Sequence, residues 1–182
     1  TSILENGVLQ FELKVMSNPN NPDSTWLMKI ESNEGDSAVE LPLTDAGDAP
    51  VAGEWKTYTY TLADLAGAGL DVSAIDVVMI FPAWGTGEGA VYRVDNAKIY
   101  DPSAASTAGS EITIFQDTAA EQWSIWDCCG GSTPTEETDD SDHGTVAEFV
   151  IGSAPTVMGF LADEGVSFDA SSILANGVVQ FE

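Results

Sequence analysis

Apolar and polar residues alternate along most of this chain with a period of two. The alternation runs through Gly7–Val15, Thr25–Ser32, Glu54–Leu62, Ala90–Tyr100 and Gly144–Ile151. A half-buried β-strand has this period, because successive side chains point to opposite faces of its sheet. Ile75–Pro82 is continuously apolar, as is typical of a central strand. Clusters of Asn, Pro, Gly and Asp separate these segments and favour turns, so the sequence predicts an all-β fold, a jelly-roll β-sandwich.

A twelve-residue segment at the start of the chain recurs almost unchanged at its end. Thr1–Glu12 reads TSILENGVLQFE and Ser171–Glu182 reads SSILANGVVQFE, with three positions different. Nothing between Leu13 and Ala170 repeats, so the period is a whole domain. We therefore interpret the chain as one period of a tandem array, cut out of phase with its natural module.

The small polar residues of Asp101–Ser110 have the composition of an unpacked linker. Residues 1–100 are then expected to form the C-terminal part of one sandwich module, and residues 111–182 the N-terminal part of the next module, or of the same one in permuted order. One sandwich has a single slot for the duplicated strand. The spare copy can fray, or it can fill the slot in a neighbouring copy of the module.

Acidic residues dominate the charge of the chain. With 30 Asp and Glu against 5 Lys and Arg, the formal net charge is −25, which repels phosphate backbones, anionic lipids and acidic polysaccharides. Nucleic acid and membrane are therefore not expected as partners. A single His, with no nucleophile elbow and no phosphate-binding loop, leads us to expect no catalytic activity.

Four stretches of the sequence carry a resemblance to a known family. They are WDCCGGSTP followed by DHGTV, WLMKIES, GEWKTYTYTLADL and VVMIFPAWGTGEGAVYRVDNAKIY. Together they resemble the jelly-roll carbohydrate-binding modules appended to secreted laminarinases and agarases of marine bacteria. The resemblance implies glycan binding without catalysis, export from the cell and a structural calcium ion.

In modules of this type, the resemblance implies, calcium lies where the first strand meets the last. The corresponding segments here are IFQDT (Ile114–Thr118) and RVDNAKI (Arg93–Ile99). Asp117 and Asp95 are the expected ligands, and Gln116 supplies a neutral carbonyl oxygen in place of the usual Glu, which calcium accepts. The alternative is that both Asp residues are turn residues bonded to their own backbone. The acidic segment Glu136–Gly144 lacks a calcium-loop pattern and is expected to be a solvated loop.

Tryptophan rings are the candidate platforms for sugar rings, because aromatic faces stack on the apolar faces of sugars. Trp84 is the strongest candidate, since the glycines that follow it cannot cover its ring. Trp123 and Trp126 should lie on opposite faces of one strand, so that one of them is in the core. Trp26 is a further candidate, whereas Trp55 is expected in the core.

The remaining candidate residues are one histidine and two adjacent cysteines. His143 is expected in a turn before a strand, with a hydrogen bond to a glycan as the alternative. Cys128 and Cys129 can close a vicinal disulfide beside Trp126, with two free thiols as the alternative. Adjacent cysteines with one histidine lack the spacing of a zinc site.

These observations lead to an expected function and to an alternative from another class. The first is an extracellular, non-catalytic glycan-binding sandwich that takes a neutral β-glucan. The second is a structural repeat of an extracellular fibre or adhesin, whose partners are neighbouring copies of the same module.

Overall fold

The computed structural model describes residues 6–102, 111–152 and 158–171. Its elements in chain order are β1 (Val8–Ser17), β2 (Trp26–Ser32), β3 (Ser37–Pro42), the 3₁₀ turn η1 (Leu43–Asp45), β4 (Trp55–Thr61), α1 (Leu62–Gly67), β5 (Ile75–Pro82), β6 (Val91–Tyr100), β7 (Glu111–Phe115), β8 (Trp123–Asp127), β9 (Ser132–Asp140), β10 (Gly144–Ile151) and β11 (Met158–Ala162). Among these elements, no helix has the length and apolar character needed to cross a membrane.

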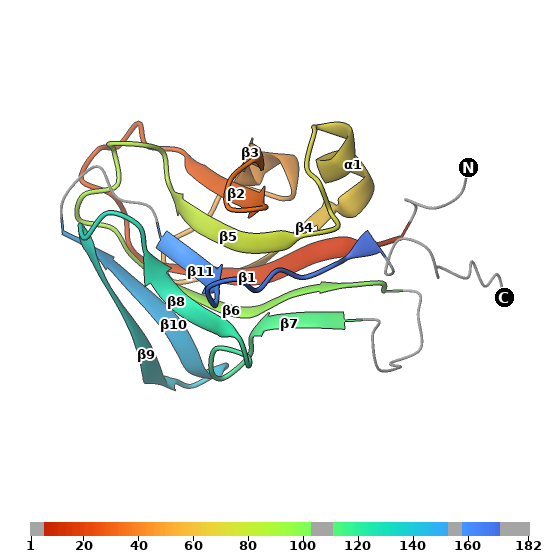
Figure 1. The fold of residues 1–182 in the computed structure, drawn as a ribbon. Helices are drawn as coiled ribbons and strands as arrows, with labels where there is room; N and C mark the ends of the chain where they lie inside the picture. The colour runs from red at the N-terminus through yellow and green to blue at the C-terminus, as the bar shows by residue number, and fades with distance from the viewer. Residues whose placement is uncertain (1–5, 103–110, 153–157, 172–182) are drawn as a thin grey trace, which may run out of the picture.

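The strands form two antiparallel sheets that pack against each other (Figure 1). Sheet A has the order β4-β1-β6-β10-β9, with β7 also pairing with β6, and sheet B has the order β3-β2-β5-β11-β8. The β-sandwich predicted from the alternating pattern is therefore confirmed.

The main core lies between the sheets and takes every second residue of the alternating strands. In β1, Phe11 and Leu13 are fully buried, whereas Glu12 and Lys14 lie on the outer face of sheet A. β5 is buried along its whole length because it lies between β2 and β11 and is covered on both faces. Its outward residues form a second apolar cluster on the outer face of sheet B, made of Val77, Met79 and Phe81 with Leu27, Trp126, Cys128 and Leu161 packed against them.

Each sheet contains strands from before residue 103 and strands from after residue 110. β10 pairs with β6, and β11 pairs with β5. Residues before and after the expected linker therefore share one sandwich here, and residues 103–110 of that linker lie outside the described residues.

The first copy of the duplicated segment supplies β1. This strand pairs with β4 on one side and with β6 on the other, so it lies within sheet A and not at its edge. The second copy, from residue 172 onward, lies outside the described residues.

One expectation about the acidic segment is wrong. Glu136–Asp140 belong to β9, the edge strand of sheet A, and only residues 141–143 form a turn. An edge strand accommodates the carboxylates before Asp140 because they remain in contact with water there, whereas Asp140 is buried. The same charges oppose pairing of this edge with another sheet.

Candidate functional site

The outer face of sheet A carries a network of charged side chains centred on Asp140. Its carboxylate is 1% exposed and lies 3.0 Å from Nζ of Lys14 and 3.4 Å from Nη1 of Arg93. The backbone amides of Asp142 and His143 donate to its other oxygen. Burial by itself raises the pKa of Asp140, but hydrogen bonds from Lys14 and from the Asp142 backbone outweigh burial and hold the pKa well below its usual range. Asp140 is thus an anion that ties the β9–β10 turn to the sheet.

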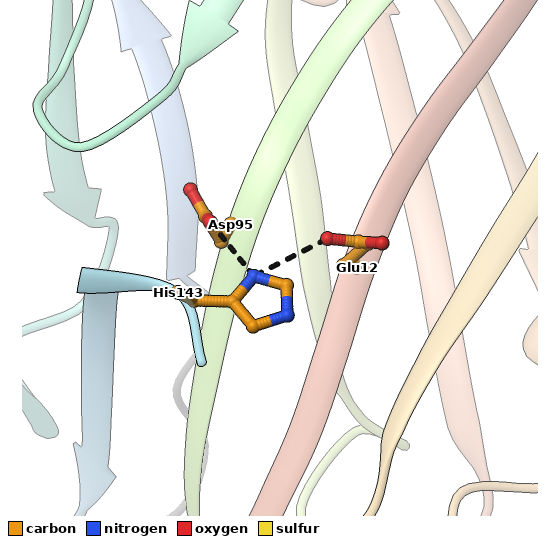
Figure 2. A group of neighbouring side chains, drawn as sticks. All are labelled: Glu12, Asp95 and His143. Carbon is orange, nitrogen blue, oxygen red and sulfur yellow. Dashed lines mark hydrogen bonds and ion pairs between the residues drawn. The ribbon is translucent and has the colours of Figure 1, made fainter. Parts of the chain in front are cut away.

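Beside this network, Glu12, Asp95 and His143 bring one ligand atom each to a common point (Figure 2). Nδ1 of His143 is 2.9 Å from Oδ2 of Asp95 and 3.3 Å from Oε2 of Glu12, and the three ligand atoms lie within 4.8 Å of one another. The residues come from β1, β6 and the β9–β10 turn. Within the described residues, this is the group of His, Cys, Asp and Glu side chains that could hold a metal ion.

A β-bulge in β6 brings the two carboxylates of this group together. Gln10 is opposite Lys98 but Glu12 is opposite Asp95, so β6 contains one extra residue between these pairs. Asn96 lies in the bulge with a left-handed φ of 50°, a conformation that Asn adopts more readily than most residues. Its Nδ2 donates to Oε2 of Glu12 at 2.7 Å and to Oδ2 of Asp95 at 3.2 Å. The bulge residue therefore orients both carboxylates.

Trp55 covers the imidazole of this group. Its ring stacks on the ring of His143 with the centroids 4.0 Å apart, and its Nε1 donates to Oδ1 of Asp140 at 3.4 Å. The expectation that Trp55 lies in the core is wrong, because it is in phase with Thr57 and Thr59 on the outer face of sheet A, whereas Tyr58 is buried on the inner face. The half-buried indole is covered by the β9–β10 turn.

The residues expected to bind calcium with Asp95 lie close by but outside this group. Gln116 and Asp117 are exposed in the turn after β7. Asp117 has a left-handed φ of 59°, and its Oδ1 accepts a hydrogen bond from the backbone amide of Thr145 at 3.4 Å. Asp117 therefore lies next to the start of β10, whereas the carboxylate that joins Asp95 in the candidate metal-binding group is Glu12.

His143 lies in a turn before β10, as the sequence predicts. Its Nδ1 contacts both Asp95 and Glu12, so that this ring atom is engaged within the protein.

The outer face of sheet B has a different character. Strand pairing places five residues opposite one another in a row across the sheet: Trp126, Gly159, Met79, Lys29 and Glu40. Four strand spacings of about 4.8 Å give the row a length of roughly 19 Å. Because Gly159 has no side chain, the row is low between Trp126 and Met79. We call these five residues the sheet B row.

Trp84 lies at the Glu40 end of the row. Trp84 is 46% exposed, and its Nε1 donates to Oε2 of Glu40 at 2.8 Å. Phe81 packs edge-on against it with the centroids 5.1 Å apart, and Nζ of Lys29 lies 5.7 Å from its ring centroid. The ring is therefore exposed and also held in place.

Trp126 and the cysteines lie at the opposite end of the row. Trp126 and Cys128 pack against the outer apolar cluster, and a disulfide joins Cys128 to Cys129. The carboxylate of Asp127 accepts hydrogen bonds from the backbone amides of Cys129 and Ser132, which fixes this loop. An open groove of about 580 Å³ begins at Trp126 and is lined by the apolar residues Val77 and Leu161 and the carboxylates of Glu31, Glu34 and Asp76.

The other two candidate tryptophans lie in the main core. Trp26 packs edge-on against Tyr92, and Trp123 stacks on Phe168 with the centroids 4.9 Å apart. Trp123 and Trp126 thus point to opposite faces of β8, as expected from their spacing. Neither Trp26 nor Trp123 presents an open ring face, because each is less than one-tenth exposed.

Sequence reasoning missed Glu12 and Trp55 as site residues. Glu12 has the outward phase of β1, and Trp55 has the outward phase of β4. The phase of each strand shows that these two side chains point outward. It does not show which outward side chains from different strands and turns lie close together. No family model, curated protein or solved structure matches this chain.

Proposed function

We propose that this domain is an extracellular, non-catalytic glycan-binding module that takes a neutral β-glucan on the outer face of sheet B. The observation that carries the proposal is the sheet B row, with Trp126 at one end and the exposed, anchored ring of Trp84 at the other. Two aromatic rings at opposite ends of a row that contains Gly159, Met79 and the ion-paired Lys29 suit stacking on two sugar rings several residues apart in one glycan chain.

Polar groups beside the row supply hydrogen-bond partners for sugar hydroxyls. Glu31 lies next to Lys29 on β2, and their side chains form an ion pair at 2.5 Å. The carboxylates of the adjoining groove extend this polar rim past Trp126. A few fixed polar groups around an apolar surface are typical of small-ligand and sugar sites.

Charge supports a neutral ligand. The net charge of −25 disfavours acidic polysaccharides, and Lys29, the cation of the row, is paired with Glu31. The outer face of sheet A is less suited to a glycan, because the Asp140 network fills it and the β9–β10 turn lies over it. The choice of β-glucan among neutral glycans comes from the sequence resemblance, which also implies calcium at Asp95, Gln116 and Asp117.

Affinity electrophoresis tests this proposal. The wild-type chain should be retarded in gels containing laminarin or another soluble neutral β-glucan, and it should migrate normally in gels containing alginate. Trp84→Ala and Trp126→Ala should each weaken retention, since the loss of one stacking ring lowers the binding free energy by about 1–3 kcal/mol. Trp55→Phe is the matched control, because Trp55 lies on the other sheet.

Near-ultraviolet circular dichroism of each variant would show that it remains folded. Absence of retention of the wild type by every neutral β-glucan would reject the proposal and favour the structural-repeat function. Equal retention of wild type and Trp84→Ala would remove the sheet B row from the binding site.

A further inference from the structure

We propose that Glu12, Asp95 and His143 bind one zinc-type divalent cation, which fastens the β9–β10 turn to β1 and β6. This inference goes beyond glycan binding, because the group lies on the outer face of sheet A and the proposed glycan site lies on sheet B. Either proposal can fail without the other.

The spacing of the three ligand atoms matches a small coordination sphere. Two ligands that are each about 2.1 Å from a tetrahedral zinc ion lie roughly 3.4 Å apart. Nδ1 of His143 already lies 2.9 Å from Oδ2 of Asp95 and 3.3 Å from Oε2 of Glu12. These two distances differ from 3.4 Å by only a few tenths of an ångström, and all three atoms lie within 4.8 Å of one another. Three protein ligands leave a fourth position for water.

The electrostatics of the group favour a cation. Asp95 is only 3% exposed, and its Oδ1 is buried with no hydrogen-bond partner among the described residues. A buried carboxylate oxygen without a hydrogen bond lowers the stability of the fold, because the water lost on burial is not replaced by another partner. The neighbouring cations are already engaged, since Lys14 pairs with Asp140, and Arg93 pairs with Asp139, Asp140 and Glu148. A divalent ion at this point would balance the two carboxylates.

The ligand types select the class of metal. Imidazole nitrogen together with two carboxylates suits zinc and similar transition ions. Calcium takes six to eight oxygen ligands, and here one of the three converging atoms is nitrogen. The group therefore fits zinc better than the calcium implied by the resemblance.

Neighbouring residues hold the ligands in place, as is usual around metal sites. Asn96 donates to both carboxylates, and the indole of Trp55 stacks on the imidazole. Asp140 accepts hydrogen bonds from the backbone of the turn that carries His143. The site is thus largely arranged before an ion enters it.

Isothermal titration of the chelator-treated chain with Zn²⁺ tests the inference, with excess Ca²⁺ present to occupy scattered surface carboxylates. One zinc ion per chain should bind, and His143→Gln and Glu12→Gln should each weaken binding at least tenfold. Asn96→Gly keeps the left-handed backbone but removes the amide, and it should weaken binding about tenfold, as outer-shell changes do. Glu31→Gln on sheet B is the matched control and should bind zinc normally.

Spectroscopy gives a second measurement that does not depend on stability. Co²⁺ bound in place of Zn²⁺ should give visible absorption in the wild type and not in His143→Gln. Because His143 is the single histidine of the chain, its ring resonances should be the ones that Zn²⁺ shifts. Zinc affinity unchanged in His143→Gln would overturn the proposal, as would displacement of zinc by equimolar Ca²⁺. Laminarin retention should be the same with and without chelator.

Discussion

The carboxylate of Asp140 lies 3.0 Å from the ammonium of Lys14 and joins β9, at the edge of sheet A, to β1. Removing one member of a buried ion pair leaves its partner uncompensated. We therefore expect Asp140→Asn to lower the free energy of unfolding by about 3 kcal/mol, measured by chemical denaturation.

Asp139→Asn is the matched control for this change. Asp139 pairs with Arg93 at 2.7 Å but is 72% exposed. Exposed pairs contribute little, so we expect a loss below about 1 kcal/mol. Equal losses of unfolding free energy in the two variants would show that the burial of Asp140 does not determine how much its ion pair stabilises the fold.

The low pKa of Asp140 also predicts acid sensitivity. A carboxyl whose pKa is lower in the folded chain than in the unfolded chain stabilises the fold fully above its unfolded pKa, about 3.9. This stabilisation is lost as the pH falls toward the lowered folded pKa. The difference in unfolding free energy between wild type and Asp140→Asn should therefore shrink from pH 5 to pH 2. A difference that stays constant over this range would contradict the assignment.

Tyr58 and Tyr60 predict a loss of stability at alkaline pH. Burial, assisted by the charge of Asp48, raises the pKa of Tyr58 to about 12, and burial also raises the pKa of Tyr60. Because the pKa of Tyr58 is higher in the folded chain than in the unfolded chain, the protonated hydroxyl stabilises the fold fully below the ordinary pKa of about 10. This contribution to the unfolding free energy is lost as the pH rises toward 12. Unfolding free energy measured from pH 8 to pH 12 should fall less steeply in Tyr58→Phe than in wild type.

The lost hydrogen bond from Tyr58 to the carbonyl of Asp48 should lower the stability of the same variant by about 1 kcal/mol at pH 7. If the unfolding free energies of the variant and the wild type fell in parallel from pH 8 to pH 12, Tyr58 would not be the cause of the loss of stability at alkaline pH.

Gly159 in the sheet B row should not tolerate a side chain. A Cβ there would clash with the carbonyl oxygen of Val78 and lie 2.6 Å from Cα of Met79, both of which are backbone atoms. Gly159→Ala should therefore destabilise the fold by about 1–3 kcal/mol, measured by thermal or chemical unfolding. In Gly67→Ala the new Cβ meets nothing within 4 Å, and the helical position should make that change neutral or stabilising by up to about 1 kcal/mol. Equal tolerance of the two changes would mean that β5 and β11 are farther apart than described.

The architecture was predictable because strand alternation follows directly from burial of one face. The continuous apolar run of β5 indicated a central strand, and the spacing of Trp123 and Trp126 indicated opposite faces. Both inferences need only the period of a strand and local composition.

The errors came from properties that a local pattern does not determine. The alternation of β4 leads to the expectation that Trp55 lies in the core, but Trp55 shares its phase with the exposed Thr57 and Thr59, and the buried face is that of Tyr58 and Tyr60. The charges of Glu136–Asp140 suggest a loop, although an edge strand leaves the carboxylates before Asp140 in contact with water and ion pairs hold the buried Asp140. The candidate metal-binding group depends on the bulge at Asn96 and on the β9–β10 turn, so it becomes visible only when the strands are paired.

The interior position of β1 determines when the duplicated segment can change partners. Val8–Glu12 is hydrogen-bonded to both β4 and β6, so exchange with another copy cannot begin by fraying at a sheet edge. It requires both ladders to open, which amounts to extensive unfolding. If neighbouring copies did compete for this position, the choice between pairing within a chain and pairing between chains would be made during folding, by competition between the tethered segment and segments at the ambient concentration. Once made, that choice would last as long as the folded state.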